Sequence, residues 1–163
     1  MCLVEMTDEE KKKSILRELK NIVMLKADIP TKNGTVYSKE SFEEMILGFT
    51  NFFHTASMIY STINERKSDE LPDMSKICGC VNNLRVETRI LEEYTEECVL
   101  IGDITIINMP SGEAIDYLMK NINVYFTPFG IRKIDLSADR NNTRARVVSY
   151  ELMGFKASLF APQ

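Results

Sequence analysis

The stretch Asn121-Ile-Asn-Val-Tyr-Phe-Thr-Pro-Phe-Gly-Ile131 is an apolar run that follows a short helical signal near residues 111–121. Its aromatic and β-branched residues favour an extended backbone, so we expect a strand over residues 124–129. Within that strand Thr127 brings a hydroxyl group, and Pro128 has no backbone N–H to donate. A strand that directly follows a short helix indicates a chain in which helices and strands are mixed.

The N-terminal part of the chain carries two further helix signals. Thr7 precedes three acidic residues, as helix N-caps do, and apolar residues then recur at helical spacing. We therefore expect an N-terminal helix within residues 1–20, from about Asp8 to Leu19, followed by residues 21–29 as a first strand or an extension of that helix. A second helix is expected near residues 38–53. Its apolar stripe is predicted to pack in the core and consists of Phe42, Met45, Ile46, Phe49 and Phe53.

The second half of the chain is dominated by strand signals. Residues 77–89 and 97–109 predict two strands joined by an acidic turn at residues 92–96, which is the pattern of a hairpin. One or two final strands are expected over residues 144–160. Residues 1–163 are thus predicted to form a single α+β domain, a β-barrel or sandwich with two or three helices.

Composition narrows the functional classes. The net charge of −4 offers no general attraction for nucleic acid, and no apolar run approaches the ~20 residues that cross a membrane. The four cysteines include a Cys78-Gly79-Cys80 pair, but they do not form two paired clusters, so no metal and no other cofactor is predicted. A cytoplasmic location is expected.

Three stretches, taken in order, resemble the capsid-maturation (prohead) proteases of tailed phages, in particular their T4-like branch. They are Lys32-Asn-Gly-Thr-Val-Tyr-Ser-Lys-Glu-Ser-Phe42, Gly102-Asp-Ile-Thr-Ile-Ile-Asn-Met-Pro-Ser-Gly112 and Ser149-Tyr-Glu-Leu-Met-Gly-Phe155. The first is similar to the family's Asn-Gly turn before a helix, the second to its glycine-led strand and Pro-x-Gly turn, and the third to its closing strand. The resemblance implies the barrel fold that this family shares with the herpesvirus assembly proteases.

The same resemblance implies where a catalytic site would lie. The family is thought to use a serine activated by a histidine. Thr127 stands at the serine position, Pro128 follows it, and Phe129 replaces an arginine. Glu65 stands where the histidine is expected, while the chain's one histidine, His54, comes earlier. If the chain is active, its catalytic residues would be Thr127, His54 and Glu65.

These substitutions favour a pseudoprotease of phage origin that assembles with or binds a capsid, scaffold or host protein. It would act in the host cytoplasm or in the virion, without nucleic acid or membrane, and homo-oligomerisation is left open. Two alternatives remain. One is an active capsid maturation protease using Thr127 and His54; the other is a phage-encoded inhibitor of a host protein, to which the acids of residues 92–97 would contribute.

Overall fold

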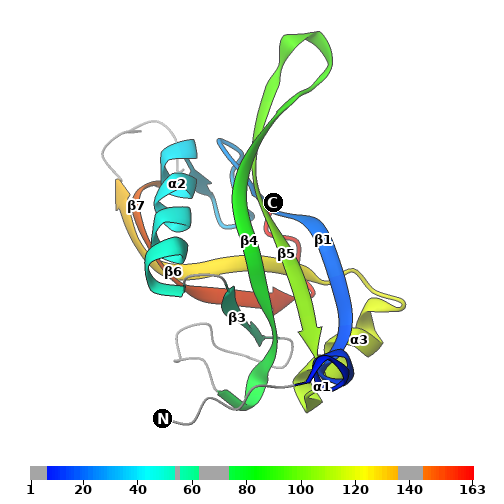
Figure 1. Cartoon of the computed structure of the whole chain (residues 1–163). Helices are drawn as coiled ribbons and strands as arrows, with labels where there is room; N and C mark the ends of the chain where they lie inside the picture. The colour runs from blue at the N-terminus through cyan, green and yellow to red at the C-terminus, as the bar shows by residue number, and fades with distance from the viewer. Residues whose placement is uncertain (1–6, 54–55, 63–73, 136–144) are drawn as a thin grey trace.

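A computed structural model of the chain describes residues 7–53, 56–62, 74–135 and 145–163, and it confirms the α+β prediction (Figure 1). Within these ranges lie the helices α1 (Asp8–Ser14), α2 (Lys39–Gly48) and α3 (Pro110–Met119). The strands are β1 (Ile15–Lys26), β2 (Thr35–Tyr37), β3 (Ala56–Ser61), β4 (Ile77–Ile90), β5 (Glu96–Ile107), β6 (Tyr125–Asp135) and β7 (Ala145–Ser158). None of these helices is long and apolar enough to cross a membrane.

One mixed sheet contains all seven of these strands, and β7 pairs with three of them, β2, β3 and β6. The strands β1, β5, β4 and β3 are neighbours in that order, and each of these pairs is antiparallel. One edge of β7 pairs antiparallel with β6 along its length, whereas the other edge pairs in parallel with β2 near its start and with β3 near its end. The strand β3 has no counterpart among the elements predicted from sequence.

The sheet is open, so the closed barrel predicted as one alternative is wrong and the sandwich-like alternative is right. Among the described residues β1 pairs only with β5, and β6 only with β7. On the other edge of β1, the backbone groups of Lys26 form hydrogen bonds with Gln163. Its side-chain amide accepts from the Lys26 N–H and donates to the Lys26 carbonyl, both at 2.8 Å, as a neighbouring strand would.

The N-terminal helix is shorter than predicted. The reciprocal cap between Thr7 and Glu10 is present, but α1 ends at Ser14 instead of near Leu19, and β1 begins at Ile15. The apolar residues that recur at helical spacing instead pair with β5, from Ile15 opposite Ile107 to Val23 opposite Ile101. A long partner strand therefore overrides a local periodicity that fits a helix.

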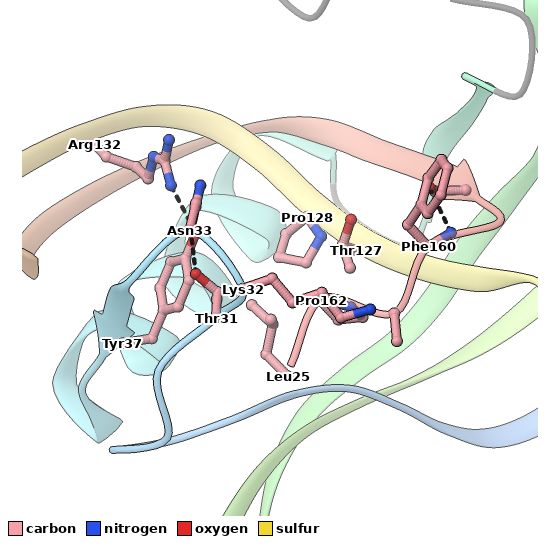
Figure 2. Close-up of a pocket in the computed structure, with 12 residues that line it drawn as sticks. Leu25, Thr31, Lys32, Asn33, Tyr37, Thr127, Pro128, Arg132, Phe160 and Pro162 are labelled. Atoms are coloured by element: carbon pink, nitrogen blue, oxygen red, sulfur yellow. Dashed lines mark hydrogen bonds between the residues drawn. The ribbon is translucent and has the colours of Figure 1, made fainter. Parts of the chain in front are cut away.

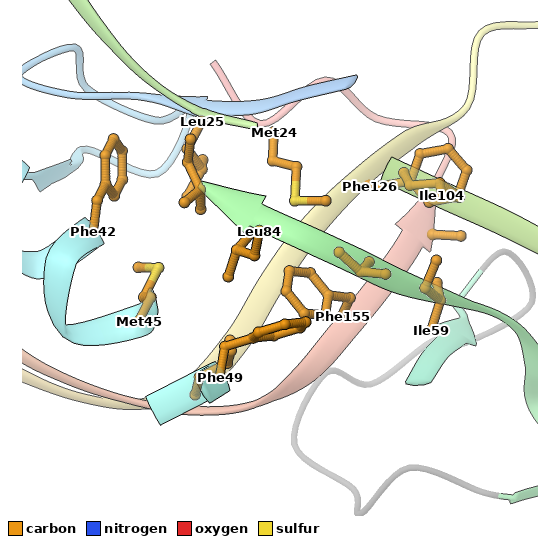
Figure 3. Packing of buried hydrophobic residues seen from close by; sticks show 14 of the residues in the cluster. Met24, Leu25, Phe42, Met45, Phe49, Ile59, Leu84, Ile104, Phe126 and Phe155 are labelled. Atoms are coloured by element: carbon orange, nitrogen blue, oxygen red, sulfur yellow. The ribbon is translucent and has the colours of Figure 1, made fainter. Parts of the chain in front are cut away.

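The core forms where α2 and the turn after it pack on the sheet (Figure 3). Phe42 and Met45 are fully buried and Phe49, which opens a π-helical turn at Phe49–Phe53, is nearly so. Ile46 and Phe53 pack against this cluster from its margin, which confirms the predicted stripe. The facing side chains come from several strands and include Ile59, Leu84, Ile104, Phe126 and Phe155.

A buried carboxylate holds two bulges in the β1–β5–β4 part of the sheet. Asn21 and Asn83 both adopt positive φ angles, 58° and 51°, where the registers of β1 and β4 with β5 shift. Asp103 on β5 accepts a hydrogen bond from the Asn21 backbone N–H at 3.0 Å and from the Asn83 amide at 3.1 Å. The Arg85 guanidinium lies 3.5 Å from the same carboxylate. Asparagine tolerates positive φ angles better than most residues, and the Asp103 interactions stabilise both bulges, at Asn21 in β1 and at Asn83 in β4.

Residues 87–97, the end of β4 and the start of β5, form an arm that extends away from the rest of the molecule (Figure 1). The predicted hairpin is confirmed, and its strands remain paired out to Ile90 opposite Glu96. Tyr94 lies at the tip with 98% of its surface exposed and Ile90 with 79% exposed. No side chain between Glu87 and Glu97 is buried among those that the structure describes.

Candidate functional site

The strand that carries Thr127 lies beside β7, which in turn lies beside β3. Thr127 on β6 is opposite Lys156 on β7, and Lys156 is opposite Tyr60 on β3. Side chains of directly paired residues project from the same face of a sheet. Thr127, Lys156 and Tyr60 therefore form a row across one face.

The surroundings of Thr127 on this face are aromatic and cationic. Phe129, two residues further along β6, shares the face, and its ring centroid lies 6.1 Å from that of Tyr60 in an edge-to-face arrangement. The Lys156 ammonium lies 5.1 Å from the Phe129 centroid, within the range of a cation–π contact. Phe129 thus contacts a lysine from the neighbouring strand.

Pro128 faces the opposite side from Thr127. It is opposite Phe155, which is itself opposite Ile59, and the latter two are completely buried core residues. The edge of β6 away from β7 pairs with no strand that the structure describes, which explains how a proline is tolerated there. The Thr127 hydroxyl makes no hydrogen bond with any described residue.

His54 and Glu65, the other two predicted site residues, lie outside the described residues, so the structure does not test a pairing of either with Thr127. The nearest described residues, Thr62 and Ala56, lie at different distances from the row of Thr127, Lys156 and Tyr60. Thr62, on the Glu65 side, is bonded to the Ala157 carbonyl through both its N–H and its hydroxyl, next to Lys156. Ala56, on the His54 side, is at the other end of β3, ~13 Å from Tyr60 at the usual rise per residue.

An open cleft of ≈ 340 Å³ runs along the free edge of β6, and we call it the Thr127 cleft (Figure 2). Among the residues that the structure describes, its lining contains two cations, Lys32 and Arg132, and no carboxylate. Arg132 and Phe160 lie at opposite ends in Figure 2, with Pro128 between them. The described residues that line it are Leu25, Thr31, Lys32, Asn33, Tyr37, Thr127, Pro128, Arg132, Ser158, Phe160, Ala161 and Pro162.

Arg132 is oriented by a tyrosine pair beneath the cleft. Its guanidinium donates to the Tyr37 hydroxyl at 3.2 Å, and the Tyr37 ring packs edge-on against Tyr150 with centroids 6.1 Å apart. Burial raises the pKa of the Tyr150 hydroxyl above its usual range, so this group stays neutral. The Tyr150 hydroxyl therefore adds no charge beside the Arg132 guanidinium.

Nothing in the described part of the chain resembles a metal centre. No three potential ligands among His, Cys, Asp and Glu lie together there. Burial raises the pKa of the Cys78 thiol to about 12 and that of Cys80 above its usual value, which leaves both as thiols at neutral pH.

Lys156, Lys32 and Arg132 escape prediction from the sequence because they come from three separate segments. One available signal is the apolar alternation of the last strand, which places Phe155 and Ala157 in the core and Lys156 on the other face. That Lys156 is opposite Thr127 follows only from the register between β7 and β6.

No protein-family model matches the sequence, and no curated protein matches it significantly. A solved structure that resembles this one is the bacteriophage T4 capsid assembly protease gp21. It superposes with a TM-score of 0.60 at 12% sequence identity, over 89% of this chain and 92% of that chain. At such low identity the likeness concerns the fold, which is therefore that of a prohead protease.

Proposed function

We propose that this chain is a non-catalytic phage protein that uses a prohead-protease-like fold to assemble with or bind another protein in the capsid context. The observation that carries the proposal is the Thr127-Pro128 pair on β6, at the place where the resemblance to the family would put the nucleophile. The chain would act in the host cytoplasm or the virion, and its partner would be a capsid, scaffold or host protein.

Peptide cleavage needs a nucleophile, a group that takes its proton, and donors for the developing oxyanion. Thr127 supplies a hydroxyl that is bonded to no described residue. Pro128 supplies no N–H, which removes the donor that follows the nucleophile directly. The rings of Phe129 and Tyr60 lie on the same face of the sheet as Thr127 and offer no donor for an oxyanion apart from the Tyr60 hydroxyl.

Peptide cleavage by Thr127 is the second candidate, because Lys156 is directly opposite it and lysine serves as the base in some hydroxyl-nucleophile enzymes. In this alternative His54 would act as the base instead of, or together with, Lys156, and Glu65 would orient it. The phage-encoded inhibitor remains a third reading, for which the exposed acidic arm is the relevant feature.

The deciding experiment incubates the purified full chain with capsid and scaffold proteins and follows their masses. We expect both substrates to stay intact and a capsid or scaffold protein to be retained on the immobilised chain. The matched control is Thr127→Val, which keeps the shape of the side chain and removes its hydroxyl. Processing by the wild type that is lost in this variant, and also in Lys156→Met, would establish the protease instead. Stoichiometric binding of one host enzyme, with loss of that enzyme's activity, would establish the inhibitor.

A further inference from the structure

The arm, residues 87–97, concentrates the negative charge of the chain. It contains five glutamates and one arginine, a formal charge of −4 that equals the net charge of the whole chain. The remainder of the chain is therefore neutral overall. Within the described residues, two ion pairs involve the arm: Glu97 with Lys26 at its base, at 3.0 Å, and Arg89 with Glu87 at 3.8 Å.

The tip of the arm is apolar as well as acidic. Tyr94, Ile90 and Leu91 are 98%, 79% and 46% exposed, and they are grouped at the turn. Tyr94 has a φ of 65°, a conformation that is costly for a bulky side chain, and the Leu91 N–H closes the turn on the Thr95 carbonyl at 2.7 Å. A solvated turn needs neither three large apolar side chains nor a strained tyrosine, so these features indicate a surface that is covered by a partner.

The Thr127 cleft has the complementary character. Lys32 and Arg132 supply two cations, while Leu25, Pro128 and Phe160 supply apolar surface, and Phe160 is itself 79% exposed. Its ≈ 340 Å³ lies at the lower end of the volumes of small-ligand sites, about 300–1,000 Å³, which suits an aromatic side chain with some adjoining backbone. The arm of the same molecule extends away from β6, the strand that supplies Thr127, Pro128 and Arg132 to the cleft lining (Figure 1).

We infer that the arm of one copy docks in the Thr127 cleft of a second copy, with Tyr94 inserted and the arm's glutamates facing Lys32 and Arg132. The two surfaces differ, so each copy has one free arm and one free cleft, and the contact repeats head to tail into a ring or a chain. The contact requires no peptide cleavage and no other partner, so its test does not depend on the proposed function.

The test measures the mass of the purified full chain by sedimentation over a range of protein concentrations. We expect the average mass to rise with concentration at about 0.01 M ionic strength and to return towards the monomer at about 1 M, because the Debye length falls from about 30 Å to about 3 Å. Tyr94→Ser and Arg132→Glu should each weaken association about 30-fold or more, as the loss of a central interface residue does. The matched control, Tyr117→Ser, removes a tyrosine that is 69% exposed on α3 and should leave the mass unchanged.

Mixing the two defective variants provides the sharper test. The Tyr94→Ser protein keeps an intact cleft and the Arg132→Glu protein keeps an intact arm, so the mixture should form heterodimers that grow no further. Circular dichroism of each variant confirms that it is folded. A wild type that stays monomeric at low salt, association that survives Tyr94→Ser, or a mixture of folded variants that forms no heterodimer would each overturn the inference.

Discussion

Asp103 on β5 and Thr127 on β6 are both polar side chains on long strands of the same sheet, but they differ in what surrounds them. Both carboxylate oxygens of Asp103 are engaged, by the Asn21 backbone, the Asn83 amide and the Arg85 guanidinium. The Thr127 hydroxyl is bonded to nothing that the structure describes, and it lies at the wall of an open cleft. A saturated polar group stabilises the scaffold, whereas an unsaturated one beside a cleft remains available to a ligand or partner.

The strands are also irregular at both places, but in different ways. At Asp103 two bulges face each other, and an ion pair between adjacent strands fixes them. At Thr127 the irregular residue is Pro128, which suits an unpaired edge and requires no polar network. The first site should therefore respond strongly to mutation in stability, and the second only weakly.

The largest effect is expected for Asp103→Asn. This change removes the charge that Arg85 and the Asn21 N–H bind, and we expect the free energy of unfolding to fall by about 2–3 kcal/mol. Urea unfolding measures it. The matched control is Asp116→Asn, which breaks the more exposed 2.7 Å pair with Arg17 and should cost about 1 kcal/mol or less. Equal losses in the two variants would show that Asp103 does not hold the bulges.

Low pH should reduce the contribution of Asp103 to the free energy of unfolding. The Asn21 N–H, followed by the Asn83 amide and the charges of Arg85 and Lys20, holds the pKa of the Asp103 carboxyl below its usual value. A pKa lower in the folded than in the unfolded state stabilises the fold above the unfolded pKa of about 3.9, and this contribution disappears as pH falls through the folded pKa. The stability difference between wild type and Asp103→Asn should be constant above about pH 5 and shrink below about pH 4. A difference that persists unchanged to pH 2 would contradict this assignment.

A smaller loss is expected for Pro128→Ala. The change frees the unfolded chain and removes part of a buried ring, which together should cost about 1 kcal/mol in urea unfolding. Pro110→Ala, at the first turn of α3, is the matched control for the proline effect alone. If Pro128→Ala costs more than Asp103→Asn, the edge of β6 is as much a part of the scaffold as the bulged strands are.

The smallest effect is expected for Thr127→Val. The valine keeps the β-branched shape, and the lost hydroxyl has no described partner, so stability should change by no more than about 0.5 kcal/mol. Thermal unfolding of wild type and variant side by side measures this. A loss above about 1.5 kcal/mol would mean that the hydroxyl is bonded in the native state, which would remove the contrast with Asp103.

Much of the fold could be predicted from local signals. The α2 stripe, the hairpin of β4 and β5, and the strand through Thr127 all follow from residue spacing, because burial on one face imposes that spacing. The end of α1 could not be predicted, since Ile15 to Val23 fit a helix and a strand alike and only pairing with β5 decides between them. The short strand β3 was not predicted, and it acquires its role only by pairing with both β4 and β7.

The candidate site divides in the same way. The sequence by itself determined that Thr127 is followed by Pro128, a residue with no backbone N–H to donate, because the chemistry of a residue needs no neighbour to define it. It also determined that the acids concentrate at one hairpin turn. Only the tertiary structure decided that Lys156 and Tyr60 lie beside Thr127, and that Lys32 and Arg132 line one cleft, to which no described residue contributes a carboxylate. Those contacts join segments far apart in the chain, and strand register, which depends on the packing of the whole sheet, sets them.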